Sequence, residues 1–582
     1  MTEPSIRDER APQQAIASGP PTPLASLREV VLAVAEELAR GLPDAADSAA
    51  GQPPAGEPPE RPVRGPISLE RPPRAEFGDY STNAALLLAP ALRRPPREVA
   101  EHLGEALGRR LGASLERFEV AGPGFLNLFL ADAWLSGALS ELLAAGEAFG
   151  GDGAPRRERI LIEFVSANPT GPMHVGHARN AAYGDALARV LSFYGHEVER
   201  EFYVNDAGSQ VRKLGESIQA LARGEPPPED GYRGAYVERL VHLAQGESID
   251  PAELGRAAVA VMVGQMQASL AAFRVRDFDG WAYESSLHEG EDSPVSHTLA
   301  LLAEQGCTYS REGALWLRTT DFGDDKDRVL VRSSGEHTYF ASDIAYHQAK
   351  RERGFDRQID VWGADHHGYV LRMKAAYEAL GGDREHLELL IMQLVHLVRG
   401  GERAQMSKRA GEFVTLDELL AEIGVDAARW YLLARSHDTT VDLDLDLARA
   451  QSNENPVYYV QYAHARIASM LAKAGPQLVL AASAGVEDRA GEPLHAAERG
   501  LIEQLLAFPV EIAEAAERRA PHRIAAYALE LAQSFTAFYR DCRVLGAEPE
   551  SLESFRIALS VASRRTIASC LELLGVSAPE EM

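Results

Sequence analysis

The stretch that decides the fold is residues 160–179, which read ILIEFVSANPTGPMHVGHAR. It opens with apolar residues that do not alternate with polar ones, which is typical of a strand buried on both faces. Two prolines and a glycine predict a loop over 166–172, a helical pattern follows as far as Gly195, and 198–204 predicts the next strand. Strand, loop, helix and strand in this order predict half of a Rossmann-type unit, whose ligand site lies at the carboxyl ends of the strands.

Two histidines, His174 and His177, stand at the start of the predicted helix. Residues three apart share a helix face, so both imidazoles would face a ligand at the helix N-terminus, where N–H groups and the helix dipole attract anions. Gly176 lets a ligand approach the backbone closely. This arrangement favours a nucleotide phosphate whose charge rises during reaction. The alternatives are a surface pair without function and a metal pair, although a metalloprotease helix has its histidines four apart around a glutamate.

These residues carry a family resemblance. HVGH at 174–177 resembles the HIGH signature of class I aminoacyl-tRNA synthetases, and EFVSANPTGPMHVGHARN at 163–180 is similar to arginyl-tRNA synthetases in particular. The resemblance runs from about residue 24 to residue 582. It implies an α/β Rossmann-type catalytic core with an α+β N-terminal domain and an all-helical C-terminal domain.

The resemblance also implies a two-step reaction. L-Arginine attacks ATP to give arginyl-adenylate and pyrophosphate, and the 2′-OH of the terminal adenosine of arginine tRNA then takes the arginyl group, which releases AMP. Mg²⁺ would accompany the nucleotide, and His174 and His177 would stabilise the α-phosphate region. Two rival hypotheses remain. One is a different adenylating enzyme with an HxGH loop, and the other is a synthetase-like RNA-binding protein without catalysis.

Composition sets the outer limits of these hypotheses. A chain of 582 residues predicts three or four domains, and no apolar run approaches the length of a membrane span. The first residues lack the blocks of a signal peptide. The three cysteines lie far apart, which predicts reduced thiols in a cytoplasmic protein and no structural zinc. The net charge of −27 argues against a generally basic nucleic-acid surface but leaves local basic strips possible. We expect a monomer.

The N-terminal part is interrupted twice by polar, proline-rich sequence. Residues 1–23 predict a disordered tail, 24–42 an amphipathic helix and 43–66 a flexible insertion. The range 24–150 resembles the N-terminal domain of arginyl-tRNA synthetases, which in that family contacts the elbow of tRNA. Arg93 and Arg94 would touch phosphate there, and a solvated charge cluster is the alternative interpretation.

The catalytic domain is predicted over 156–446, with an insertion at 208–332 that holds two helix-like segments and no sign of an editing site. Its second half begins near Tyr339. A buried strand over 359–362 is followed by a loop, GADHHG, in which His366, His367 and Gly368 match the adenosine-facing loop of class I enzymes; an ordinary polar turn is the alternative. The range 390–400 predicts one further buried strand.

A lysine loop follows. Met406, Ser407 and Lys408 resemble the KMSKS signature, although Gln405 replaces its first lysine and Arg409 its last serine. The resemblance makes Lys408 the contact for the leaving pyrophosphate. Some arginyl enzymes instead carry a lysine just before the first histidine, but here that region reads TGPM. Of these two positions, only that of Lys408 therefore supplies a mobile positive charge for the pyrophosphate.

The arginine pocket follows from the same resemblance, which assigns it Glu163, Asn168, Tyr339 and Asp343. A guanidinium favours carboxylate partners, so Asp343 and Glu163 would hold it, while Asn168 would hold the amino-acid backbone. Tyr339 and Asp343 are four residues apart and would share a helix face. Either carboxylate would instead be structural if a protein arginine paired with it.

The C-terminal range 447–582 is helical in pattern and resembles the anticodon-binding domain of arginyl-tRNA synthetases. Helices are predicted over 455–474, 501–515, 524–544 and 555–574. Tyr458, Tyr459 and Tyr462 would stack on unpaired anticodon bases, and for each of them a place in the core is the alternative.

Overall fold

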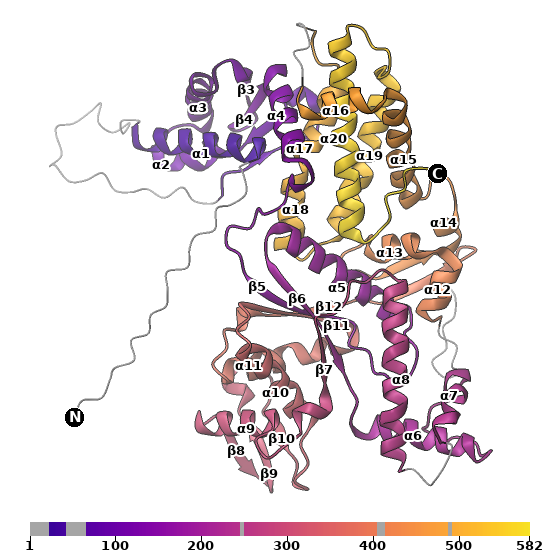
Figure 1. The fold of residues 1–582 in the computed structure, drawn as a ribbon. Coiled ribbons are helices and arrows are strands. Elements are labelled where there is room, and N and C mark those ends of the chain that lie inside the picture. Colours follow the sequence, from indigo (N-terminus) through magenta and orange to yellow (C-terminus); the bar gives the residue numbers. More distant parts are fainter. Residues whose placement is uncertain (1–21, 42–65, 245–249, 404–413, 487–491) are drawn as a thin grey trace, which may run out of the picture.

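The computed structural model describes residues 22–41, 66–244, 250–403, 414–486 and 492–582 (Figure 1). The tail predicted over 1–23 and the insertion predicted over 43–66 lie outside the described residues except at their last positions. The lysine loop with Met406, Ser407 and Lys408 lies wholly outside the described residues. In Figure 1 the N-terminal domain lies at the upper left, the C-terminal helices at the upper right and the catalytic α/β part below them.

The N-terminal domain is an α+β unit. Its elements are α1 (Pro23–Gly41), β1 (Leu69–Glu70), β2 (Tyr80–Thr82), α2 (Ala84–Leu92), α3 (Pro96–Leu111), β3 (Leu115–Ala121), β4 (Phe125–Leu130) and α4 (Asp132–Ala145). The strands form an antiparallel sheet in the order β1-β2-β4-β3. Leu126 and Leu128 of β4 are fully buried in one core with side chains of α1, α2 and α3. Alternate residues of β4 therefore face the opposite side of the sheet.

The catalytic part is built on a five-stranded parallel sheet in the order β12-β11-β5-β6-β7. Its strands and first helix are β5 (Arg159–Glu163), α5 (Val175–Tyr194), β6 (Glu197–Val204), β7 (Gly280–Tyr283), β11 (Arg357–Gly363) and β12 (Leu387–Met392). The predicted strand, helix and strand are confirmed by β5, α5 and β6. The chain passes from β5 to β6 on one side and later adds β11 on the other. Ligands of α/β sheets typically bind at such a switch in strand order, which points to the carboxyl ends of β5 and β11 as the site.

The single strand predicted over 390–400 is wrong. The structure has two strands there, β12 and β13 (Val395–Arg399), and β13 belongs to a separate small sheet in the order β14-β13-β15, with β14 (Glu402–Arg403) and β15 (Val441–Asp444). Gln393 separates them because its N–H donates to the His437 carbonyl, 2.8 Å away, and its own carbonyl accepts from Arg179 at 2.7 Å. An uninterrupted apolar run in the sequence does not reveal that the chain leaves one sheet and joins another.

The insertion contains more structure than the two predicted helical segments. It includes α6 (Gly208–Ala222), α7 (Ala235–Leu240), α8 (Pro251–Ala272), α9 (Pro294–Glu304), β8 (Thr308–Arg311), β9 (Ala314–Leu317) and β10 (Arg328–Val331). The last three form an antiparallel sheet. Strand β7 also comes from this range, yet it pairs with β6 as the edge of the catalytic sheet. Four-residue strands are too short to give a clear alternating pattern.

The all-helical C-terminal domain confirms the predicted fold class. Its helices are α15 (Pro456–Ala474), α16 (Pro476–Ala484), α17 (Ala496–Leu506), α18 (Phe508–Glu517), α19 (His522–Asp541) and α20 (Glu550–Leu574). The helix predicted over 501–515 is divided into α17 and α18 because Pro509 starts a new helix in its first turn. Within the described ranges no single helix is long and apolar enough to cross a membrane; α15 and α16 meet that test only jointly, with a bend of 108° between them.

A buried ion cluster fixes helix α5 against the C-terminal helices. Asp185 of α5 accepts hydrogen bonds from Arg189 and from Arg429, which lies on α13 (Val425–Leu433). Arg429 is fully buried and also donates to the carbonyl of Leu574 at the end of α20, 2.7 Å away. The helix that carries the two histidines is therefore anchored to the C-terminal helices by buried charged groups that all have hydrogen-bond partners.

Candidate active site

The structure brings His174 and His177 together at the N-terminus of α5. Their rings stack with centroids 3.7 Å apart. His174 Nδ1 accepts the Gly176 N–H at 3.1 Å, and His177 Nδ1 accepts the His174 N–H at 3.3 Å. A Cβ at position 176 would lie 2.9 Å from the His174 ring, so any larger residue would force the ring to shift. Because both Nδ1 atoms accept, the neutral rings carry their protons on Nε2.

The protonation state follows from the surroundings. Burial, with a smaller effect of His174, lowers the pKa of His177 to about 3. A neutral imidazole with Nε2–H is a hydrogen-bond donor, not a fixed cation. The backbone contributes less than expected to anion binding, because the Val175 N–H already donates to Val414 and the Gly176 N–H to His174. The ring nitrogen of each histidine that does not accept one of these backbone N–H groups is Nε2, which carries the proton when the ring is neutral.

The segment after the lysine loop is fastened to the same helix end. Thr415 forms a β-bridge with His174, and the Leu416 N–H donates to Met173 at 2.8 Å. Lys408 itself lies outside the described residues. The described residues that follow it in the chain are nevertheless in contact with the histidine pair.

A group of carboxylates lies at the neighbouring strand ends. Asp343, on α10 (Tyr339–Glu352), accepts a hydrogen bond from the Tyr369 hydroxyl at 2.6 Å, and burial raises its pKa. Glu284 is 5% exposed, and its Oε2 has no hydrogen-bond partner among the described residues. Burial, followed by the charges of Asp343 and Asp206, raises the pKa of Glu284 to about 7. A cation entering here would relieve this mutual repulsion.

Sequence reasoning missed Glu284 and Asp206, although a signal for them existed. Glu284 directly follows β7, and Asp206 comes two residues after the end of β6. Parallel strands bring their carboxyl ends to the same edge of the sheet, so polar residues at both positions converge. The Asp206 carboxylate accepts two hydrogen bonds from Ser285, which fixes it beside Glu284.

Glu163 lies in a different environment. Both of its oxygens are engaged, since Ser166 Oγ donates to Oε1 at 2.7 Å and Lys350 Nζ donates to Oε2 at 2.5 Å. Lys350 also donates to Asp360 at 2.8 Å, and His347 lies 2.6 Å from the other Asp360 oxygen. Burial opposes the charge of Asp360, but Lys350 and His347 outweigh it and hold its pKa at about 2. The structural partner of Glu163 is thus a lysine, where an arginine had been considered.

The remaining predicted residues of the site are exposed around this edge. Asn168 is exposed in the loop after β5, and Tyr339 is 55% exposed at the first position of α10. His366, His367 and Gly368 are exposed in a 3₁₀ helix (Ala364–Tyr369), where a loop had been predicted. This short helix directly follows β11, next to β5, and the His366 ring lies 5.8 Å from that of Trp362.

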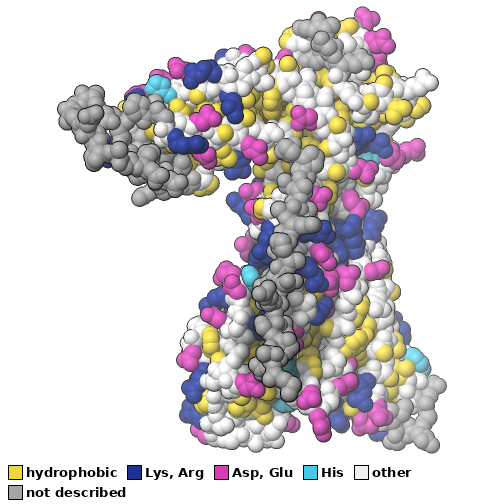
Figure 2. Space-filling view, turned by 60° about the vertical axis from the view of Figure 1, so that its left-hand side comes forward, with side chains coloured by type: hydrophobic (Ala, Val, Ile, Leu, Met, Phe, Trp, Pro, Cys, Tyr) yellow, Lys and Arg dark blue, Asp and Glu magenta, His cyan; other side chains and the backbone are white. Residues whose placement is uncertain are grey.

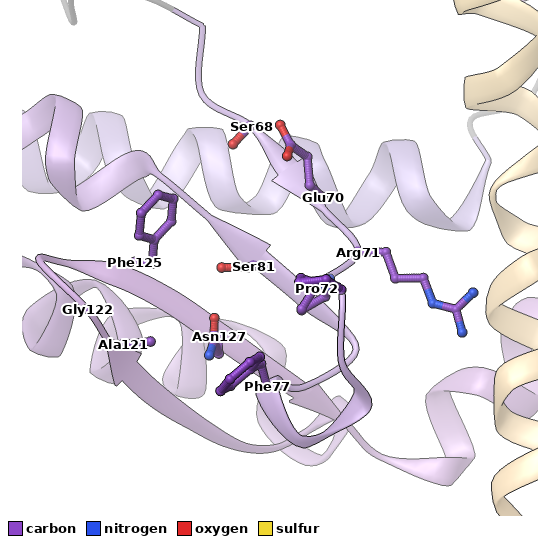
Figure 3. A pocket seen from close by; sticks show the side chains of 11 residues that line it. Ser68, Glu70, Arg71, Pro72, Phe77, Ser81, Ala121, Gly122, Phe125 and Asn127 are labelled. Carbon is purple, nitrogen blue, oxygen red and sulfur yellow. The ribbon is translucent and has the colours of Figure 1, made fainter.

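A pocket of about 390 Å³ lies on the open face of the N-terminal sheet (Figure 3). Phe77 and Phe125 line it and are 40% and 41% exposed. Between them lie Ser81 and Asn127, which are paired residues on the neighbouring strands β2 and β4. Two aromatic rings beside an amide offer a stacking surface and a hydrogen-bonding group for an unpaired base. Figure 3 shows Arg71 pointing from the pocket rim toward the C-terminal helices, where it contacts Glu503 at 2.6 Å.

The predicted arginines lie on the same domain. Arg93 is exposed at the end of α2, whereas Arg94 pairs with Glu98 at 2.6 Å. Arg93 therefore remains the more accessible of the two for a phosphate. Basic and acidic side chains are interspersed over the face drawn in Figure 2, so the net negative charge does not form one acidic surface there.

The three predicted tyrosines of α15 have different environments. The rings of Tyr458 and Tyr462 stack with an interplanar angle of 9° and centroids 6.1 Å apart. Arg466 lies over both Tyr462 and Tyr539. Tyr459 points elsewhere, because its hydroxyl donates to Thr536 and its ring packs on the core. Tyr458, Tyr462 and Arg466 thus form a surface row of stacked groups, which we call the tyrosine–arginine row.

Comparison with known proteins gives matches along most of the chain. Residues 33–130 match the arginyl tRNA synthetase N terminal domain, 138–467 the class I (R) tRNA synthetase catalytic domain, and 460–582 the DALR anticodon binding domain. An arginine–tRNA ligase of Carboxydothermus hydrogenoformans is 45% identical over 534 residues, which cover 89% of this chain and 94% of the relative. That of Bacillus subtilis is 44% identical over 532 residues, with the same coverage.

Solved structures agree with these matches. Thermus thermophilus arginyl-tRNA synthetase superposes with a TM-score of 0.74 at 26% identity, covering 96% of this chain and 99% of the other. A structure described as a putative arginyl-tRNA synthetase from Campylobacter jejuni gives a TM-score of 0.71 at 34% identity, covering 78% of this chain and 100% of the other.

Proposed function

The chain belongs to the arginyl-tRNA synthetase family, and from this membership we propose how its residues carry out the family's reaction. The enzyme ligates L-arginine to its tRNA: arginine and ATP give arginyl-adenylate and pyrophosphate, and the tRNA then accepts the arginyl group with release of AMP. The observation that carries the residue assignment is the position of the carboxylates Glu284 and Asp343 at the same edge of the sheet as the stacked histidines.

Two neutral imidazoles would bind the nucleotide. The Nε2–H groups of His174 and His177 would donate to the α-phosphate region as its charge rises, which is stabilisation by preorganised donors. Gly176 leaves room for close approach, and His366 and Gly368 would face the adenosine. Met406, Ser407 and Lys408 would cover the pyrophosphate. The position of Thr415 against His174 supports this part of the proposal, because it holds the end of that loop beside the histidines.

Mg²⁺ would be held mainly by the phosphates of ATP. The described part of the chain has no group of three or more side chains suited to hold a metal ion, so the donor set fits a nucleotide-borne ion better than a protein cage. Bound there, the ion would offset phosphate charge during pyrophosphate departure. The proposal includes no structural zinc, because burial raises the pKa values of Cys542 and Cys570 and so disfavours the thiolates that zinc prefers.

The guanidinium of arginine would lie against Asp343 and Glu284. Glu284 supplies a buried oxygen with no described partner, and both carboxylates are destabilised as anions until a cation arrives. Tyr339 and Asn168 would line the pocket and contact the substrate. Glu163 would also line the pocket, and hydrogen bonds from Lys350 and Ser166 fix the orientation of its carboxylate.

The tRNA would contact two separate surfaces of the protein, one on the N-terminal domain and one on the C-terminal domain. An unpaired base of its elbow would enter the pocket of Phe77, Phe125 and Asn127, with Arg93 and Arg94 near its phosphates. Anticodon bases would stack on the tyrosine–arginine row, with Tyr459 supporting it from the core. We expect the enzyme to act as a monomer, and its widely spaced thiols support a reducing cytoplasmic environment.

Pyrophosphate exchange tests the assignment of substrate. Each of the twenty amino acids is supplied with ATP, Mg²⁺ and labelled pyrophosphate, with and without arginine tRNA. We expect exchange with arginine alone, at least a hundredfold above lysine, because lysine's point charge cannot copy the bidentate contacts of a guanidinium. Exchange with another amino acid and none with arginine, cognate tRNA present, would overturn the proposal.

A further inference from the structure

The turn after β5 has a backbone conformation that its residues rarely adopt. Val165 has φ 68° and Ser166 has φ 37°, both in the left-handed region. Among the described residues, Val165 is the only β-branched one with positive φ. A branched side chain is a genuine outlier in this region, so the surrounding structure must hold it there.

One buried amide holds this turn. The Val165 N–H donates to Oδ1 of Asn180 at 2.6 Å, and Nδ2 of Asn180 donates to the Val361 carbonyl at 2.8 Å. Asn180 is 7% exposed and lies on α5, three residues after His177. Because Val165 offers an N–H and Val361 a carbonyl, Oδ1 of Asn180 must face Val165 and Nδ2 must face Val361. Asn180 therefore connects the turn after β5, the histidine helix and strand β11.

The turn determines where two parts of the site lie. It directs Ser166 Oγ back onto Glu163 at 2.7 Å, and the same hydroxyl accepts the Tyr203 N–H at 3.1 Å. Beyond the turn the chain runs through Asn168 to His174. If the turn relaxed to negative φ, Ser166 would leave Glu163 and the loop would start in a different direction.

We propose that Asn180 is a positioning residue for adenylate formation, because its amide keeps the turn at Val165 and Ser166 in the left-handed conformation that aligns the arginine pocket with the histidine pair. The inference rests on the proposed function, since it concerns the geometry of that same site. Adenylate formation needs the arginine carboxylate within contact distance of the α-phosphate, so a shift of about 1 Å costs on the order of a hundredfold in rate.

The first test compares Asn180→Ala with Asn180→Asp in arginine-dependent pyrophosphate exchange, at saturating arginine, ATP and tRNA. The aspartate keeps an acceptor for the Val165 N–H but faces the Val361 carbonyl with a buried charge. We expect Asn180→Ala to lower kcat at least thirtyfold, and Asn180→Asp to retain at least five times more activity per folded molecule. A purely structural role predicts the reverse order, because the buried carboxylate is the more destabilising change.

The second test uses glycine, which adopts positive φ without strain. Val165→Gly alone should keep kcat within about threefold of the wild type. In this background Asn180→Ala should cost at most fivefold, since the turn no longer depends on the amide. Asn455→Ala is the matched control, because Asn455 is a buried asparagine with three hydrogen bonds at the junction of α14 (Leu445–Arg449) and α15. It should lower the urea midpoint comparably and leave kcat unchanged.

Four outcomes would overturn the proposal. They are a lower activity of Asn180→Asp than of Asn180→Ala, an Asn180→Ala kcat within twofold of wild type, an equal loss in the wild-type and Val165→Gly backgrounds, and an equal loss in the Asn455→Ala control. Wild-type protein without arginine-dependent exchange would instead overturn the proposed function, and the role of Asn180 with it. The wild-type measurement thus separates the two failures.

Discussion

The buried ammonium group of Lys350 donates a hydrogen bond to Glu163, the last residue of strand β5, with 2.5 Å between Nζ and Oε2. The lysine is fully buried, and Asp360 takes a second hydrogen bond from it. Although burial opposes its charge, Asp360 and Glu163 raise the pKa of Lys350, so it stays a cation. Removing it would leave two buried carboxylates facing each other.

Lys350→Met should therefore lower the free energy of unfolding by about 3–5 kcal/mol, the usual effect of breaking a buried ion pair. Urea unfolding at pH 7 measures this change. Lys213→Met is the control, because the Lys213–Asp230 pair lies at the surface and should matter little. Equal losses in both variants would contradict the buried role of Lys350.

Asp343→Asn should weaken arginine binding and leave ATP binding almost unchanged. The amide cannot pair with a guanidinium charge, so we expect the KM for arginine to rise roughly a hundredfold, which corresponds to about 2.7 kcal/mol. Discrimination against citrulline should shrink, since we expect the wild-type pocket to reject a neutral isostere that would leave a carboxylate unpaired. Steady-state exchange with both compounds measures this. An unchanged KM would remove Asp343 from the pocket without affecting the family assignment.

Lys408→Ala should slow adenylate formation by about a hundredfold or more, because one preorganised contact to developing charge is worth about 2.7–4 kcal/mol. No lysine precedes His174 that would replace it. Binding of tRNA, measured by filter retention, should change little. Lys473→Ala, at an exposed position near the end of α15, is the matched control. Near-normal exchange in Lys408→Ala would show that another group contacts the pyrophosphate.

Gly184→Ala should destabilise the protein by roughly 1–3 kcal/mol through overpacking. A Cβ at this position of α5 would lie 2.2 Å from the Phe164 ring, in the core below the strained turn. Gly137→Ala is the opposite case, since nothing lies within 4 Å of its Cβ on the exposed side of α4. That change should stabilise by about 0.5–1 kcal/mol, because alanine is the better helix former. Thermal unfolding of both variants checks the sign of each effect.

The sequence alone was enough to predict the parts of the fold that depend on local pattern. Helix α5 and the C-terminal helices have long periodic signals, strand β5 has an uninterrupted apolar run, and the spacing of His174 and His177 placed both rings at one helix end. Glu284 was missed because its relation to Asp206 comes from the pairing of β6 with β7, which are separated by a long stretch of the insertion. Lys350 was missed as the partner of Glu163 because the two residues are 187 positions apart and no local pattern links them.

His177 should make stability depend on pH. Its pKa is about 3 in the folded protein, mainly through burial, and about 6.5 in the unfolded chain. Between these values the unfolded chain binds a proton that the folded protein does not. Acid therefore favours unfolding, and this contribution to stability is present above about pH 6.5 and is lost as the pH falls, by up to about 1.4 kcal/mol per pH unit.

His177→Asn tests this argument, because the Asn carbonyl oxygen replaces Nδ1 as acceptor for the His174 N–H but does not titrate. Unfolding free energies at pH 7, 6 and 5 are measured for both proteins. The wild type should lose more stability than the variant over this range. Parallel curves would mean that His177 is as easily protonated in the folded state as in the unfolded one. The pair would then face the nucleotide as a cation, and the proposal of two neutral Nε2–H donors would fail.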